Sequence, residues 1–186
     1  QEAPVAKKVN TLKIVDEPKG CYKAGDYPCA VKSLQRNQIQ QEEVTLNLNR
    51  NSILVFYSMK HFRLLEGLFY FKGLNKNKIE TNQVQFNANG ELMISVSAAR
   101  SEVFNINSEM VWTEKTQPLS SPPVGFQNWY GYSNTRFSEG VIEPIQWVKF
   151  IKLWAPFIGN EVEAKKNISF FKEIWAGNTQ QASEYY

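Results

Sequence analysis

The sequence predicts a mainly β protein, a sandwich or an irregular β-solenoid of short antiparallel strands, with a two-helix cap near its C-terminal end. Three observations support this prediction. Apolar and polar residues alternate between residues 11 and 116, turn signals recur about every eight to twelve residues, and the apolar spacing becomes helical from residue 144. At 186 residues, the chain has the length of one domain.

The all-β domain is predicted over residues 11–116, after a flexible leader at residues 1–10. In "VTLNLN", residues 44–49, apolar and polar side chains alternate, which is typical of a half-buried strand. "SILVFY", residues 52–57, is apolar on both faces and predicts a central strand. Asn89-Gly90 predicts a type I′ turn, and another strand pair is expected around Asn107 and Ser108. "KGLNKNK", residues 72–78, predicts a solvated hairpin loop.

A Pro- and aromatic-rich crossing loop is predicted over residues 117–143, because "TQPLSSPPVG" is followed by aromatic residues set among small polar ones. Two interpretations stay open for these aromatic residues. They form either a lid folded onto the sheet or an exposed platform for a glycan, in which flat rings contact sugar CH groups and amides bind hydroxyls. The candidate ligand-binding residues are Phe126, Trp129, Tyr130, Tyr132 and Phe137.

The two-helix cap is predicted over residues 144–177, with a frayed tail at 178–186. Residues 145–157 are apolar except for a narrow polar stripe of Gln146, Lys149 and Lys152, which predicts a helix buried on most sides. Asn160 is expected to cap a second helix, which Gly177 ends.

The two cysteines, Cys21 and Cys29, predict a disulfide. Two cysteines and one histidine are fewer than the about four ligands that a zinc site needs. Seven residues separate the cysteines, whereas the C-x-x-C motif of redox pairs has two. The alternative is two unrelated buried thiols. A disulfide favours a periplasmic or extracellular location. The polar beginning, "QEAPVAKKVN", agrees with a mature terminus left after removal of a signal peptide.

The sequence contains no motif typical of most catalytic or cofactor-binding sites. One histidine excludes multi-histidine metal sites, and Asp16 and Asp26 are the only aspartates, so we expect no metal, no cofactor and no catalytic residues. The lysines are scattered, which argues against nucleic acid, and no apolar run is long enough for membrane insertion. The rival hypothesis is a glycan- or peptidoglycan-acting hydrolase using Glu139 and Glu143, or His61.

Residues 44–115 resemble the FecR domain in the order of three stretches: "VTLNLNRNSILVFYSMKHFRLLEGLFYF", "NKIETNQVQFNANGELMISV" and "VFNINSEMVWT". In the best-known members of that family, this periplasmic all-β module is the sensor of a transmembrane anti-sigma regulator and contacts an outer-membrane receptor. The quoted stretches cover the β module alone, so signalling to a sigma factor is not carried over. The resemblance implies a non-catalytic envelope domain.

From these observations we expect a non-catalytic periplasmic or secreted binding or scaffold domain, whose partner is a cell-envelope protein or a glycan. A structural assembly subunit is a further alternative.

Overall fold

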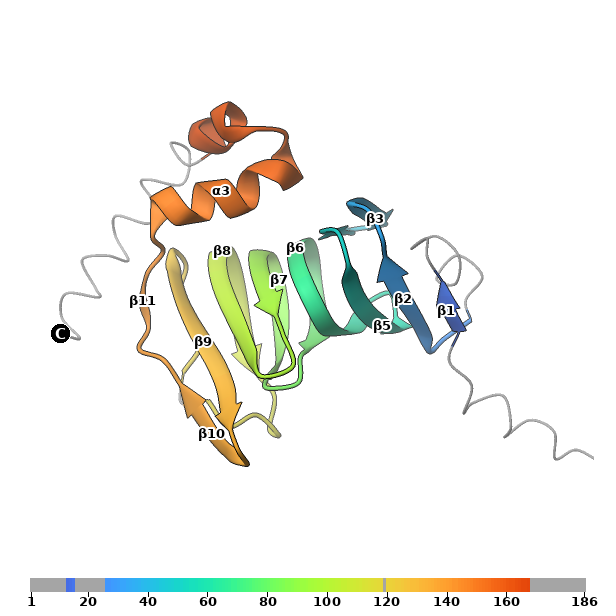
Figure 1. The fold of residues 1–186 in the computed structure, drawn as a ribbon, viewed down its shortest axis with the longest axis vertical. Coiled ribbons are helices and arrows are strands. Elements are labelled where there is room, and N and C mark those ends of the chain that lie inside the picture. Colours follow the sequence, from blue (N-terminus) through green and yellow to red (C-terminus); the bar gives the residue numbers. More distant parts are fainter. Residues whose placement is uncertain (1–12, 16–25, 119, 168–186) are drawn as a thin grey trace, which may run out of the picture.

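The computed structural model describes residues 13–15, 26–118 and 120–167 of the chain (Figure 1). It confirms a mainly β protein with helices near the C-terminal end. The strands are β1 (Lys13–Val15), β2 (Cys29–Ser33), β3 (Asn37–Gln41), β4 (Val44–Leu48), β5 (Ser52–Ser58), β6 (His61–Glu80), β7 (Gln85–Val96), β8 (Arg100–Trp112), β9 (Phe126–Ser133), β10 (Arg136–Glu139) and β11 (Glu143–Pro144). Helix α3 (Trp147–Ile158) follows, and residues 161–167 are also helical.

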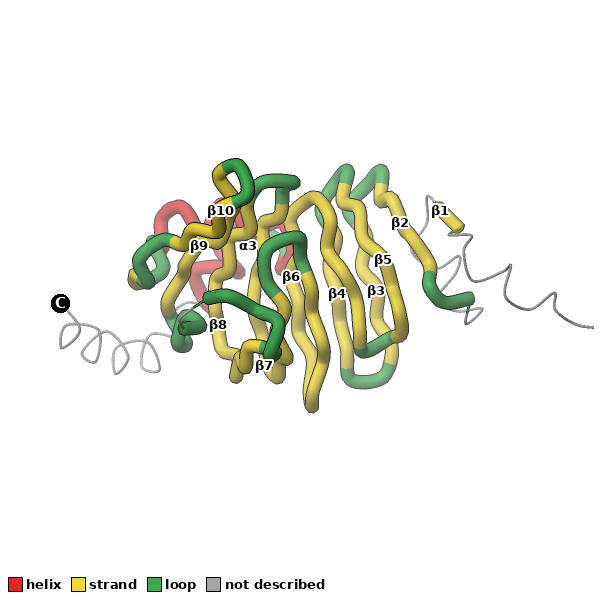
Figure 2. Tube along the Cα trace, turned by 90° about the horizontal axis from the view of Figure 1, so that it is seen from below, coloured by secondary structure: helices red, strands yellow, loops and turns green. Residues whose placement is uncertain are grey.

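These strands form a single sheet in which chain neighbours mostly pair with each other (Figure 2). Strands β6 to β10 follow one another as antiparallel neighbours. The opposite edge of β6 pairs with β5 near its beginning and with β4 further along. Strand β2 continues the sheet beyond β5, and β3 continues it beyond β4. Strand β1 is parallel to β2, whereas the other pairs are antiparallel.

The long strands bend instead of turning, and this corrects three of the turn predictions. Gly90, predicted in a hairpin turn, lies inside β7 with a positive φ of 131°. The pairing of β7 with β8 shifts register next to it, and β8 runs without interruption through Ser108. Residues 72–78 likewise form an irregularity inside β6, where Asn75 has a positive φ. A positive-φ residue serves a β-bulge as well as a hairpin, so the local sequence did not distinguish them.

A buried asparagine fixes the bend in β8. Asn105, 2 % exposed, accepts a hydrogen bond from the Ser108 backbone N–H at 2.7 Å. Its amide group donates to the carbonyl oxygens of Ser108 and Pro122, both at 2.9 Å. The same side chain therefore holds the β8 bulge and anchors the proline-containing segment that leads to β9.

The larger hydrophobic core, called the main core here, lies along one face of the sheet. Residues alternate between the two faces of a strand, and in β6 Phe69 and Phe71 belong to this core whereas Tyr70 does not. Aromatic rings meet within it, for example Phe56 with Phe62 and Phe86 with Trp112. Leu46, Leu92 and Ile94 are among its buried aliphatic members.

Helix α3 covers the opposite face, where a second core, the helix-covered core, forms. It joins Tyr70, Met93, Phe104 and Ile106 of the sheet to Phe150, Trp154 and Ala155 of α3 and to Ala164. The helix predicted here packs on the sheet, with Lys149 and Lys152 exposed as expected. It is not buried on most sides as predicted, because Val148 and Leu153 are exposed as well and only one side of α3 faces the sheet. Figure 1 shows α3 next to β7 and β8, and its contacts are with middle parts of β6, β7 and β8.

The second helical segment begins as predicted. The side-chain oxygen of Asn160 accepts the backbone N–H of Glu163 at 3.0 Å, which is the hydrogen bond of a helix cap. The predicted helix end at Gly177, the leader at 1–10 and the tail at 178–186 lie outside the described residues. Within the described part of the chain, no helix has the length and apolar character needed to cross a membrane.

Candidate functional site

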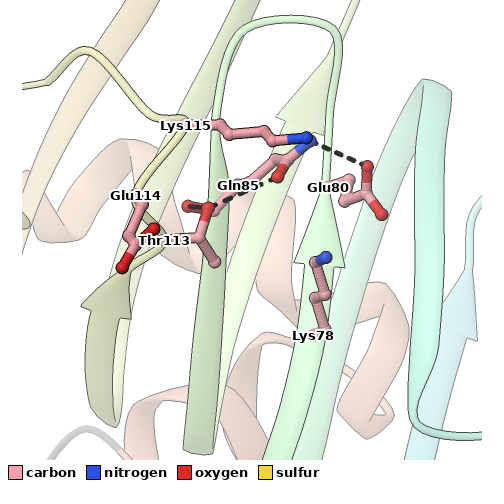
Figure 3. Close-up of a pocket in the computed structure, with 6 residues that line it drawn as sticks. All are labelled: Lys78, Glu80, Gln85, Thr113, Glu114 and Lys115. Atoms are coloured by element: carbon pink, nitrogen blue, oxygen red, sulfur yellow. Dashed lines mark hydrogen bonds between the residues drawn. The ribbon is translucent and has the colours of Figure 1, made fainter.

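A polar pocket of about 460 Å³ lies at the end of the β6–β7 hairpin (Figure 3). Its lining contains charged, amide and hydroxyl side chains from three segments: the end of β6, the start of β7 and the residues just after β8. The lining residues are Lys78, Glu80, Gln85, Thr113, Glu114 and Lys115. We call it the polar pocket.

Strand register brings these residues together across the sequence. Glu80 and Gln85 are the last pair of the β6–β7 hairpin. On the other side of β7, Phe86 pairs with Trp112, which places Thr113 next to Gln85. The backbone N–H of Thr113 continues this ladder by donating to the Gln85 carbonyl oxygen at 3.1 Å. The pocket is thus a consequence of the β6–β7–β8 register.

Glu80 is at the centre of a hydrogen-bonded network. It is 7 % exposed, and it accepts a hydrogen bond from the Gln85 amide at 3.0 Å. Its other carboxylate oxygen contacts Nε2 of His61, and the ring of Tyr57 lies 4.8 Å from the His61 ring. A buried carboxylate with two such partners is well satisfied, and its own interactions occupy both of its oxygens.

Two threonines complete the network on the β8 side. The Thr116 hydroxyl donates to the Gln85 carbonyl oxygen at 2.7 Å and accepts the Gln85 backbone N–H at 3.1 Å. The Thr113 hydroxyl lies 3.3 Å from the Gln85 side-chain oxygen, to which it donates. Gln85 is therefore held by its backbone and by both ends of its amide.

The charged groups around this network have no such partners. Lys78 is half-buried, whereas Glu114 and Lys115 are exposed, and none of these three side chains forms an ion pair with a described residue. The pocket thus combines a fixed polar base with a rim of two cations and one anion. Because these rim charges are not paired with described residues, they are available to attract oppositely charged groups of a partner.

The predicted aromatic platform has a different structure from the one expected. Residues 117–143 were predicted as a crossing loop, but they contain β9 and β10, which form a hairpin. Phe126 is 3 % exposed and Tyr130 is fully buried in the main core. Their burial rules out a direct role in an exposed platform, because alternate residues of β9 point into the protein.

The other three predicted aromatic residues remain partly accessible. The guanidinium of Arg100 lies 4.0 Å from the ring centre of Trp129, covering one face of the indole. Tyr132 and Phe137 contact each other edge to face at 5.6 Å. A ligand-binding role for Trp129, Tyr132 and Phe137 stays a prediction.

The candidate carboxylates of the rival hydrolase hypothesis belong to two short strands that pair with the same edge of β9, the edge facing away from β8. Glu139 of β10 pairs with Tyr130, and Glu143 of β11 pairs with Gln127, whose side-chain amide donates to it at 3.1 Å. Their partners on β9 are separated by roughly 10 Å of strand, at about 3.3 Å per residue. His61, the other catalytic candidate, is held by Glu80.

A second pocket, of about 510 Å³, lies beside the helix-covered core and contains Glu91. The hydroxyl of Tyr70 donates to the Glu91 carboxylate. Burial raises the pKa of Glu91 above its ordinary value, although the Tyr70 hydrogen bond and the Lys72 charge act in the other direction. Burial, assisted by the Glu91 charge, also raises the pKa of Tyr70, so this tyrosine stays protonated.

Cys29 is fully buried at the start of β2. Its predicted partner, Cys21, lies outside the described residues, so the disulfide stays a prediction. Among the described residues, no group of three or more His, Cys, Asp or Glu side chains is arranged to hold a metal ion.

No family model matches the chain, and no curated protein matches it. Two crystal structures of a "putative anti-sigma factor" from Parabacteroides distasonis are similar in fold, each with a TM-score of 0.47 and 14% identity. The matched regions cover 68% and 70% of this chain, and 62% and 63% of the other. The chain therefore spans less than two thirds of that protein. At this level of similarity, a function does not transfer from one protein to the other.

Among the residues in and beside the polar pocket, only Lys78, through the "KGLNKNK" segment, and the neighbouring His61 stand out in the sequence. Glu80, Gln85 and Thr113 belong to no pattern that predicts a site. The available signal was "ETNQ", residues 80–83, where a turn-forming Thr-Asn pair closes a hairpin and puts the flanking polar residues at its end.

Proposed function

We propose that the chain is a non-catalytic binding domain that contacts a protein partner through the polar pocket, and that it works in the periplasm or outside the cell. The observation that carries the proposal is the contrast within this pocket. Glu80, Gln85 and His61 are committed to one another, whereas Lys78, Glu114 and Lys115 have no partner among the described residues. Groups available for binding are present, and the buried polar groups serve to hold them in position.

The internal network argues against hydrolysis at this pocket. A general acid or base needs a lone pair or a proton directed at a substrate, and a nucleophile needs a base within hydrogen-bonding reach. The Glu80 carboxylate is instead engaged by Gln85 and His61. The Thr113 and Thr116 hydroxyls are directed at oxygen atoms of Gln85.

A protein partner fits this surface better than a glycan does. Glycan recognition needs exposed aromatic faces, and two of the five residues predicted to supply them, Phe126 and Tyr130, are buried. Among the described residues, none that lines the polar pocket is aromatic. Its mixed charges suit the polar rim of a protein interface. The FecR-domain resemblance of residues 44–115 implies an envelope domain that binds a protein or a glycan, and the predicted disulfide supports an oxidising compartment.

Charge reversal tests the proposal directly. The variant Lys78→Glu/Lys115→Glu is compared with Lys149→Glu/Lys152→Glu, which makes the same change of charge on the exposed side of α3. Each protein is immobilised, and the proteins captured from an envelope extract are quantified by mass spectrometry. We expect wild type and the α3 variant to retain a common partner that the pocket variant loses. Capture that is equal for all three would refute the pocket as the binding surface.

A second measurement tests the absence of catalysis. Wild-type protein is incubated with purified peptidoglycan, and soluble fragments are measured by chromatography. Fragment release that the Glu143→Gln or His61→Ala substitution abolishes would overturn the non-catalytic assignment, whatever the capture experiment gives.

A further inference from the structure

Strand β3 has one unpaired edge within the described part of the chain. It pairs with β4 over residues 37–41, and no other described strand pairs with it. An unpaired edge presents a row of backbone N–H and C=O groups that another strand can extend.

The sequence of this edge lacks the usual protection against pairing. Proteins shield edges with charged side chains, prolines or very short strands. The other described edge strands have such features: β1 is three residues long, β10 has Arg136 and Glu139 at its ends, and β11 ends in Pro144. By contrast, β3 reads "NQIQQ", in which four neutral amides surround Ile39.

The β3–β4 hairpin determines which backbone groups point outward. A two-residue turn, Glu42-Glu43, joins Gln41 to Val44, which are paired in the register. In such a hairpin the pair next to the turn is hydrogen-bonded, and bonded pairs then alternate along the strands. Gln41, Ile39 and Asn37 therefore direct their N–H and C=O groups toward β4. Gln38 and Gln40 direct theirs to the open edge.

We propose that this edge pairs with the same edge of a second copy of the chain, antiparallel and centred on Ile39. In that register, Gln38 of each copy faces Gln40 of the other, and both have outward-directed backbone groups. The result is a two-fold symmetric extension of the sheet with hydrogen-bonded Gln38–Gln40 pairs. It is also the register in which all five residues of β3 are paired.

The flanking charges favour this register. Arg36 precedes β3 and Glu42 follows it, both are exposed, and neither forms an ion pair with a described residue. Centring on Ile39 places Arg36 of each copy opposite Glu42 of the other, so the symmetric pair gains two complementary contacts. Moving the centre to Gln38 would place Arg36 opposite Gln40, and moving it to Gln40 would place Arg36 opposite Val44, so either shift loses both contacts.

Exposed leucines flank the same edge. Leu34, 48% exposed, precedes β3, and Leu74, 59% exposed, lies beside the turn, where its backbone N–H donates to the Glu43 carbonyl oxygen at 3.2 Å. An antiparallel pair brings the Leu34 end of one β3 to the turn end of the other. Each copy therefore contributes apolar surface at both ends of the paired strands.

Sedimentation over a range of protein concentrations tests this dimer. We expect wild type to show a concentration-dependent mass rising toward two copies. Arg36→Glu places two acidic groups opposite each other and should weaken the dimer about tenfold or more, since two attractive contacts become repulsive. Adding Glu42→Arg to it restores complementarity and should restore the dimer. Lys149→Glu on α3 is the control of equal charge change and should leave the dimer unaltered.

Gln40→Pro supplies an independent variant. Proline removes an N–H that points to the open edge and leaves the bonds to β4 in place, so circular dichroism should be unchanged while the dimer is lost. Wild type that stays monomeric at all concentrations would refute the proposal. So would a dimer that neither Arg36→Glu nor Gln40→Pro weakens. None of these variants alters the polar pocket, so its partner capture is tested separately.

Discussion

Replacing Gly90 by alanine tests whether a glycine bulge bends the long strands. At φ 131° the backbone of Gly90 has a conformation that side chains other than glycine rarely adopt. An alanine Cβ there would lie 2.7 Å from the Cα of Ser108 on the neighbouring strand. Backbone strain of this kind costs about 1–3 kcal/mol, and overpacking against a neighbour costs about 1–3 kcal/mol more. We therefore expect Gly90→Ala to lower the free energy of unfolding by about 2–6 kcal/mol, out of a total of about 5–15 kcal/mol.

Gly159→Ala is the matched control for this experiment. Gly159 ends α3 with φ 130°, but the nearest atom to an added Cβ is Cγ of Glu163 at 3.7 Å, an ordinary contact. This variant should show the backbone strain alone, about 1–3 kcal/mol. Urea denaturation with linear extrapolation measures both variants. Equal losses for the two, or a Gly90→Ala variant as stable as wild type, would refute the close approach of β7 and β8 as the reason for the glycine.

Three further predictions concern the second core, the buried carboxyl and the cysteines. Trp154→Ala should lower the free energy of unfolding by about 3–5 kcal/mol, because Trp154 is 1% exposed and joins α3 to the sheet; near wild-type stability in urea would show that α3 does not pack there. Glu91 has a raised pKa in the folded protein, so its contribution to stability is fully present below pH 4.5 and is lost as the pH rises through the folded value. As the pH rises from acid to neutral, the free energy of unfolding of wild type should therefore fall relative to that of the Glu91→Gln variant. A difference between the two proteins that does not change with pH would contradict the burial of that charge. Intact mass of protein alkylated in denaturant, with and without reduction, should show labelling of Cys21 and Cys29 only after reduction, whereas labelling without reduction would contradict the disulfide.

The strands themselves were predictable, because burial on one face imposes a period of two on the sequence. The stretch "VTLNL" became β4, with Val44, Leu46 and Leu48 buried as their spacing predicts. The helix after residue 144 was equally visible from its apolar spacing, but the expectation of burial on most sides was wrong. The sheet covers Phe150 and Trp154, whereas Val148 is 75% exposed and Leu153 is 37% exposed.

The continuity of the strands was not predictable, because it depends on tertiary contacts. Asn89-Gly90 has the composition of a hairpin turn, yet β7 passes through it and pairs with neighbours on both sides. Nothing within that dipeptide states whether the chain reverses or bulges. The deciding contacts come from β8, where Asn105 holds the backbone of Ser108. A turn signal therefore predicted an irregular position correctly but not the direction of the chain beyond it.

The same dependence on register explains why the sequence predicted the aromatic residues, and not the residues of the polar pocket, as the binding site. Trp129 and Tyr130 are adjacent in sequence and read as one exposed cluster, but a strand sends adjacent side chains to opposite faces, and Tyr130 fills the main core. Glu80 and Thr113 are far apart in sequence and carry no common motif, yet both flank Gln85 once β7 is paired on its two edges. In such a sheet, local composition predicts which residues are buried. A surface site, by contrast, consists of polar residues that the pairing of neighbouring strands brings together. The charge-reversal experiment at Lys78 and Lys115 therefore tests the strand register and the binding surface together.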